Sequence, residues 1–292
     1  MKTFLLALFL FTLLPAAAPA QQPEPPTAEE QLRRRVEALS RTGRTEEAIQ
    51  MLETRREQGD LSEALVRRLV RLYRDAGRWE DVEALLLELE PDESRMDFGG
   101  LRQLADARFR LGREQEAEET LERAIALDPY DASRVAVVAN IYAQWGDLDR
   151  AIEVLIEARE RLDSPTEFAQ SLSRHYSRRG DMVPAVREAC LVVAAGPLNL
   201  AIMRGQVLQY VEDAPELGEE CLQAARSVQL DYPEVSQLGI LVAEIALALG
   251  AEDEAWAELR PLVGAPALSQ DLLRICLLYT SPSPRDQRPN LV

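Results

Sequence analysis

The chain has 292 residues, of which 47% are hydrophobic and 5% aromatic, with only 14 glycines. This apolar content is enough for a sizeable core, and the scarcity of aromatic residues and glycines disfavours many-stranded β architectures and favours packed helices. Fifty acidic residues outnumber 33 basic ones, for a formal charge of −17. That balance disfavours nucleic-acid binding and polybasic membrane association, because both need clustered cations.

The N-terminal segment has the pattern of a secretory signal peptide at residues 1–20. Lys2 precedes an apolar run at residues 4–14, and an Ala-Pro-Ala sequence ends at Ala20. The run is shorter than the ~20 residues of a membrane-spanning helix, so we expect cleavage after Ala20 and no membrane span afterwards. The protein is therefore predicted to be periplasmic or secreted. Residues 21–27 contain three prolines and are expected to form an extended linker.

Glycines recur at a nearly constant interval through the rest of the chain. The first five are 34, 35, 34 and 34 residues apart, the sixth follows 70 residues later, and Ala214 occupies the intervening slot. These glycines are Gly43, Gly77, Gly112, Gly146, Gly180 and Gly250. A repeat of this length indicates one pair of helices per unit, with the glycine in the turn between them, where a positive φ is tolerated.

Apolar residues follow helical spacing on both sides of each glycine. In one first helix they lie at Val135, Val138, Ala139 and Tyr142, which is one amphipathic face. Second helices carry small and apolar residues at similar spacing, and a proline such as Pro129 ends them because its ring cannot continue the helix. The sequence therefore predicts an all-α protein.

These positions resemble the tetratricopeptide repeat family. The matching residues of the third repeat are Leu101, Leu104, Ala105, Gly112, Ala117, Leu121, Ala124 and Pro129. The resemblance covers about seven repeats at residues 28–264 and implies a tetratricopeptide-like helical-hairpin solenoid (superhelix). In such a solenoid the first helices would line a concave groove and the second helices the convex back. The sixth repeat fits only after a shift of one residue, so we expect altered geometry between residues 205 and 225.

The C-terminal end is expected to depart from this repeat. Residues 265–275 would begin a further repeat, broken off after Ile275. Residues 276–286 resemble a translated sequencing adapter, so 276–292 are interpreted as a non-native tail, although a native Pro/Ser-rich tail has a similar composition.

Residues for catalysis or metal binding are scarce. The single histidine, His175, has no Ser or Cys partner at a recognisable spacing and is expected to be a partly exposed structural residue. No phosphate-binding glycine loop and no Cys/His cluster is present. We therefore predict a non-enzymatic protein without catalytic residues, cofactor or metal.

The cysteines and the tryptophans also need an interpretation, the cysteines because export leads to an oxidising compartment. Cys190 and Cys221 lie on consecutive second helices, and free buried thiols are favoured over a disulfide, which stays possible in an oxidising compartment. The three tryptophans, Trp79, Trp145 and Trp256, lie at or after the turns and are expected to pack repeats together.

Charge divides unequally between the two kinds of helix. The predicted first helices carry 16 arginines and 8 acidic residues, for a net +8, whereas the second helices carry 12 and 28, for a net −16. By the family resemblance, an acidic protein would present an Arg-lined groove. Guanidinium groups pair with carboxylates, and amide side chains can hold a peptide backbone.

The candidate peptide-binding residues are Arg67, Arg71, Arg74, Arg102, Asn140, Gln144, Gln170, Arg174 and Arg178. We predict an exported scaffold that binds protein or peptide in this groove, with an acidic segment or a C-terminal carboxylate as the ligand. Three alternatives stay open. The repeats could be the recruiting N-terminal half of a larger exported enzyme or envelope-assembly factor, they could form a spacer without a ligand, or the arginines could simply be solvated.

Overall fold

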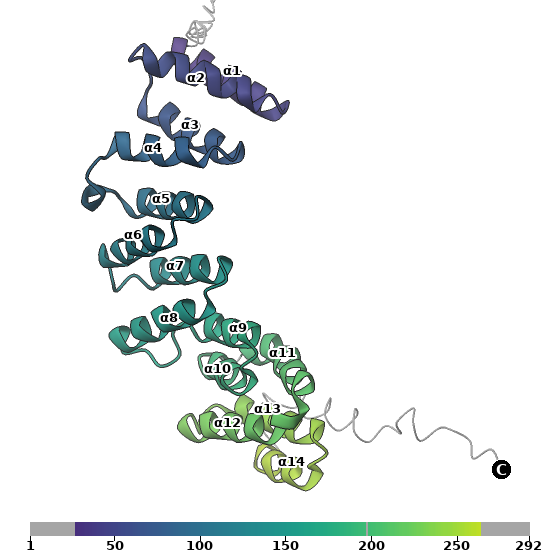
Figure 1. Cartoon of the computed structure of the whole chain (residues 1–292). Helices are drawn as coiled ribbons and strands as arrows, with labels where there is room; N and C mark the ends of the chain where they lie inside the picture. Colours follow the sequence, from purple (N-terminus) through teal and green to yellow (C-terminus); the bar gives the residue numbers. More distant parts are fainter. Residues whose placement is uncertain (1–26, 197, 264–292) are drawn as a thin grey trace, which may run out of the picture. The chain divides into compact units, whose positions relative to one another are not determined.

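A computed structural model describes residues 27–196 and 198–263 of the chain. The predicted signal peptide, nearly all of the linker, the start of a further repeat at 265–275 and the tail at 276–292 lie outside the described residues. Within these residues the chain is all-α, with fourteen α-helices and three short 3-10 helices (Figure 1). The expected succession of helical hairpins is confirmed.

Seven pairs of α-helices follow one another along the chain. They are α1 (Ala28–Arg41) and α2 (Thr45–Glu57), α3 (Glu63–Asp75) and α4 (Trp79–Leu89), α5 (Phe98–Arg110) and α6 (Glu114–Ala126), α7 (Ala132–Gln144) and α8 (Leu148–Leu162), α9 (Ala169–Arg179) and α10 (Met182–Ala194), α11 (Asn199–Asp213) and α12 (Gly218–Asp231), and α13 (Ser236–Ala248) and α14 (Glu252–Leu259). The 3-10 helices are η1 (Glu93–Arg95), η2 (Pro215–Leu217) and η3 (Arg260–Leu262).

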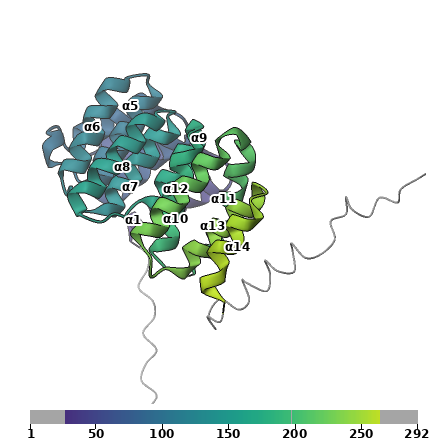
Figure 2. The same ribbon diagram turned by 90° about the horizontal axis from the view of Figure 1, so that it is seen from below.

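The helices fall into two compact units that divide between Arg78 and Trp79, at the turn that joins α3 to α4. The first unit holds α1 to α3, in which α2 packs against both neighbours. The second unit holds α4 to α14, in which each helix packs against the next. In Figure 1 the second helices α6 and α8 lie to the left of the first helices α7 and α9; Figure 2 shows the same unit from below.

The turn glycines have the backbone conformation that the repeat predicts. All six have φ between 73° and 95°. This conformation is strained for a residue that has a side chain, but not for glycine. At Gly146, the amide of the next residue, Asp147, donates to the carbonyl of Tyr142 at 3.0 Å. This bond satisfies a carbonyl that the end of α7 would leave without a partner.

Small residues let the two helices of a hairpin approach closely. In the cluster around α7 and α8, Ala139, Ala143 and Ala151 are buried together with Leu155 and Leu172. Each hairpin leaves an apolar face that only its neighbours can cover, so stability depends on the interfaces between successive hairpins.

The sixth hairpin departs from the regular turn, as the shifted sequence pattern predicts. Ala214 has φ −135° instead of a positive value, and η2 separates α11 from α12. Gly218, which begins α12, is buried. A Cβ added to it would lie 2.4 Å from Cδ2 of Leu249. The glycine therefore permits a close approach between helices rather than a turn.

Two predictions about single residues are wrong. His175 is 1% exposed rather than partly exposed; its position corresponds by the repeat to Leu72, Ala107 and Ile141, which face the interior. Trp256 is 46% exposed rather than packed between repeats. It lies on α14, and no further hairpin follows α14 among the described residues.

The two cysteines are free and buried, as favoured by the sequence. They lie on α10 and α12, which pack against each other. Burial raises the pKa of the Cys190 thiol to about 12 and that of the Cys221 thiol to about 11. Both thiols are therefore protonated at neutral pH and are poor nucleophiles.

Candidate peptide-binding face of the first helices

Three first helices of the second unit present corresponding side chains at the 34-residue interval. Residues four apart on a helix lie on one face, and on α5, α7 and α9 that face contains three positions each. We call the nine residues at these positions the first-helix face. They are Arg102, Asp106 and Arg110 on α5, Ala136, Asn140 and Gln144 on α7, and Gln170, Arg174 and Arg178 on α9.

The first-helix face is accessible to a partner. Seven of its nine side chains are exposed, and only Asp106 and Ala136 are half-buried. Contacts join successive first helices along it. The Arg110 guanidinium of α5 lies over the Trp145 ring beyond α7, and Nη2 of Arg178 on α9 donates to the Ala143 carbonyl of α7 at 3.0 Å.

The charges on this face favour an anionic ligand. It carries four arginines and one carboxylate, that of Asp106. Arg102 and Arg174 form no ion pair with any residue that the structure describes, so their donors are available to an incoming group. The amides of Asn140, Gln144 and Gln170 likewise make no hydrogen bond within the described part of the chain, and they lie between and beside these arginines.

Other arginines of the first helices are already used within the protein. Arg134 pairs with Asp131 at 2.9 Å and lies over the Phe98 ring. Arg179 pairs with Asp149 at 2.5 Å and also contacts Asp181. The net positive charge counted from the sequence therefore overstates how many guanidinium groups can meet a ligand.

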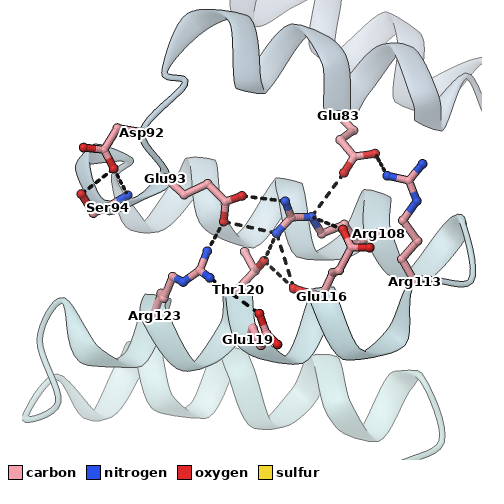
Figure 3. A network of polar contacts seen from close by, with 10 residues as sticks. All are labelled: Glu83, Asp92, Glu93, Ser94, Arg108, Arg113, Glu116, Glu119, Thr120 and Arg123. Atoms are coloured by element: carbon pink, nitrogen blue, oxygen red, sulfur yellow. Dashed lines mark hydrogen bonds and ion pairs between the residues drawn. The ribbon is translucent and has the colours of Figure 1, made fainter.

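Arg108 is the clearest example of an arginine that serves the fold. It occupies the position where other first helices carry tyrosine, and its side chain is only 8% exposed. Its Nη2 donates to Oε1 of Glu93 at 2.6 Å, its Nε donates to Oε1 of Glu83 at 3.3 Å, and its Nη1 donates to the Thr120 hydroxyl (Figure 3). The Arg108 hydrogen bond lowers the pKa of the Glu93 carboxyl, which therefore stays ionised.

This network joins α4, η1, α5 and α6. Arg113 donates to the second oxygen of Glu83 at 2.7 Å, and Arg123 donates to Glu93, so each of the two carboxylates has two guanidinium partners (Figure 3). Because every charge is paired, we assign the network to stability rather than to ligand binding.

Arg110 belongs to the face but was not among the residues chosen from the sequence. Its guanidinium lies 5.2 Å from the ring centroid of Trp79 and 5.0 Å from that of Trp145, whose ring stacks on Phe109 at 5.1 Å. Cation–π contacts of this kind hold the side chain in place. The sequence repeat could have indicated Arg110, because it lies 34 residues before Gln144, which was chosen as a candidate.

The remaining candidates, Arg67, Arg71 and Arg74, lie on α3 in the first unit. Arg67 and Arg71 are exposed, and Arg74 is half-buried. Arg67 pairs with Glu63 at 2.9 Å on the same helix, an exposed contact of small energetic value. These three arginines thus share one helix, as the sequence predicts.

The described residues contain the single histidine but no cluster of metal ligands. His175 has no hydrogen-bond partner at either ring nitrogen. No group of three or more His, Cys, Asp or Glu residues is placed to hold a metal ion in residues 27–196 and 198–263. In the same part of the chain, no helix has the length and apolar character needed to cross a bilayer.

Comparison with known proteins gives a family match for one part of the chain. Residues 103–131 match the model of the tetratricopeptide repeat family, and a comparison with curated proteins gives no match. Among solved structures, the chain is similar to a tetratricopeptide repeat protein from Parabacteroides merdae, with 14% identity, coverage of 85% of this chain and 98% of that one, and a TM-score of 0.45. It is also similar to the C-terminal part of a repeat-containing protein of this kind from Cytophaga hutchinsonii, with 12% identity, coverage of 81% and 98%, and a TM-score of 0.46.

Proposed function

We propose that this tetratricopeptide-repeat chain is an exported, non-enzymatic scaffold that binds an extended acidic segment of a partner protein along its first-helix face. Repeats of this kind stack into long surfaces suited to holding a polypeptide. The observation that carries the proposal is the pair of exposed arginines, Arg102 and Arg174, which have no acidic partner among the described residues and lie on a face with a single carboxylate.

The chemistry of the face fits an extended acidic chain. The guanidinium groups of Arg102 and Arg174 can each form two parallel hydrogen bonds to a carboxylate. The amide of Asn140, on the helix between them, can donate to and accept from the backbone of an extended segment. Side-chain carboxylates and a C-terminal carboxylate would both satisfy these arginines.

Binding is tested with a fluorescein-labelled peptide rich in Asp and Glu, prepared with a free and with an amidated C-terminus. We expect the R102A/R174A variant to raise the Kd about thirtyfold, since each of the two charge-assisted contacts contributes about 1 kcal/mol at an exposed site. The matched control is R95A/R260A, which removes two exposed arginines outside the face. Fluorescence anisotropy measures both variants.

Equal affinities of the two variants would show that overall charge, not the first-helix face, determines binding. Comparison of the free and amidated peptides separates the two sources of carboxylate. A large difference in Kd assigns recognition to the chain terminus, and no difference assigns it to the acidic side chains.

Export is supported by the sequence pattern of residues 1–20. We expect the protein produced in a bacterial host to be recovered from the periplasm with Gln21 as its first residue. Intact-mass measurement of that fraction tests this expectation. Recovery of the unprocessed chain in the cytoplasm would contradict it.

A further inference from the structure

Two adjoining cavities in the second unit are lined by residues of α8, α9 and α10 and of the end of α12. One has a volume of about 630 Å³ and the other about 610 Å³, and Ile156, Glu160 and Tyr176 line both. The shared residues make them one groove, which follows α8 from Asp149 to Glu160 and continues to α10 and the end of α12. We call it the α8–α10 groove.

Apolar side chains form the interior of the α8–α10 groove. Ile152 and Leu191 are buried, and Ile156, Tyr176 and Tyr232 are half-buried, so each of the last three has apolar surface that a ligand can cover. Covering such surface provides the main favourable free energy of most associations.

More carboxylates than arginines line the α8–α10 groove. Arg159 donates to both oxygens of Glu188 at 2.9 Å and 2.6 Å, and Arg179 pairs with Asp149 at 2.5 Å. Arg187, 3.7 Å from Glu188, is the third arginine of the groove.

Three carboxylates of the groove have no such partner. Glu157, Glu160 and Asp231 are exposed, and none of them pairs with a cation in the described part of the chain. The free charge at the groove is therefore negative, and its complement is a cationic group.

The dimensions of the groove favour a polypeptide over a small cation. From residue 149 to residue 160 the rise along α8 is about 16 Å. An extended chain covers that length with about five residues, and a helix with about eleven. A single cationic metabolite would cover only part of the apolar interior.

We propose that the α8–α10 groove binds a segment of a partner protein in which apolar side chains alternate with or are flanked by arginine or lysine. The apolar side chains cover Ile156, Tyr176 and Tyr232, and the cations pair with Glu157, Glu160 and Asp231. This site lies on different helix faces and has the opposite charge preference from the first-helix face, so it does not depend on the function proposed above. Together the two sites would let one chain hold an acidic and a basic segment at once.

The test uses a short fluorescein-labelled peptide of arginine and leucine, an analogue with serine in place of leucine, and two triple variants of the full chain. E157Q/E160Q/D231N removes the unpaired carboxylates of the groove. E114Q/E216Q/D253N removes the same number of exposed, unpaired carboxylates elsewhere in the second unit and is the matched control. All six residues are exposed, and thermal unfolding of both variants verifies that the fold is intact.

We expect saturable one-to-one binding of the Arg/Leu peptide, a Kd raised roughly tenfold by the groove variant, and little change in the control. The serine analogue should bind at least tenfold more weakly, and R102A/R174A should leave the Kd unchanged. Equal losses in the two triple variants, or equal binding of the serine analogue, would overturn the proposal, because either result describes general attraction to an acidic protein.

Discussion

At the residue scale, the repeat position predicts burial better than the residue type does. Arg108 and His175 are both polar, and both occupy positions where other repeats carry buried aromatic or apolar residues. The protein accommodates them differently. Arg108 has a full set of acidic and hydroxyl partners, whereas His175 has no hydrogen-bond partner at either nitrogen.

Removing the Arg108 guanidinium should be strongly destabilising. In R108L, Glu83 and Glu93 lose a buried partner, and breaking a buried pair in this way costs about 3–5 kcal/mol. The triple variant R108Y/E83Q/E93Q, which restores the usual tyrosine and removes the charges, should recover most of that loss. Urea denaturation measures the free energy of unfolding, and an R108L value within about 1 kcal/mol of the parent would contradict this assignment.

His175 should make stability depend on pH. Burial, followed by the charges of Arg174 and Arg178, lowers its pKa from 6.5 to about 4. Between these pH values the histidine binds a proton in the unfolded chain but not in the folded chain. The free energy of unfolding is therefore unaffected by protonation of this residue above pH 6.5 and falls as the pH approaches 4. The full loss attributable to this residue, reached below pH 4, is about 3 kcal/mol.

The measurement compares the parent with H175L, in which this group is absent. Carboxylates titrate in both proteins, so the difference between the two unfolding free energies isolates the histidine. Between pH 7 and pH 4 the parent should lose stability relative to H175L. Parallel pH profiles would show that His175 does not titrate differently in the folded state.

At the scale of elements, the sequence predicts the hairpins because the repeat places a glycine at each turn. It also predicts one of the two irregular regions. The other lies near Pro165, which follows Pro129 by 36 residues instead of 34. There α8 extends to Leu162, and a loop containing positive φ at Asp163 and Phe168 precedes α9. The one-residue shift near Gly218 corresponds to η2 and the close approach to Leu249. The exposure of Trp256 could not be predicted from the sequence around it, because it depends on what packs against α14.

Substitutions of two glycines should fail for different reasons. Gly146 has φ 93° and no atom within 4 Å of an added Cβ, so G146A should cost about 1 kcal/mol of backbone strain whatever its neighbours are. Gly218 has φ −58°, so G218A should cost about 1–3 kcal/mol through the clash with Leu249.

The second substitution that separates the two causes is L249A. Added to G218A it should remove the clash, so the double variant should be more stable than the sum of the two single effects predicts; added to G146A it should be additive. Thermal or urea unfolding of the three single and two double variants measures this. Additivity for both pairs would contradict the close approach assigned to Gly218.

At the scale of the whole molecule, the excess of arginine on first helices and of acid on second helices was evident from the sequence. The period also aligns Arg102 with Gln170 and Asn140 with Arg174. The sequence could not show which arginines are consumed internally, because the partners of Arg108 and Arg178 lie 8 to 35 residues away on other helices. The α8–α10 groove was missed for the same reason, since its lining comes from four helices.

Ionic strength should affect acidic-peptide binding at the first-helix face. Attraction between exposed charges weakens as added salt shortens the screening length from ~10 Å at 0.1 M to ~3 Å at 1 M. The Kd of the Asp/Glu-rich peptide should therefore rise with salt, and the rise should be smaller for R102A/R174A than for R95A/R260A. Identical salt dependences would mean that the long-range charge of the protein, and not these two arginines, attracts the peptide.

Photo-crosslinking locates the bound segment and so tests whether an acidic peptide lies along the first-helix face. An Asp/Glu-rich peptide carrying a photoreactive phenylalanine is irradiated with the full chain, and the attachment sites are mapped by mass spectrometry. We expect attachment to residues of α5, α7 and α9. Attachment mainly to α6, α8 or α10 would contradict it.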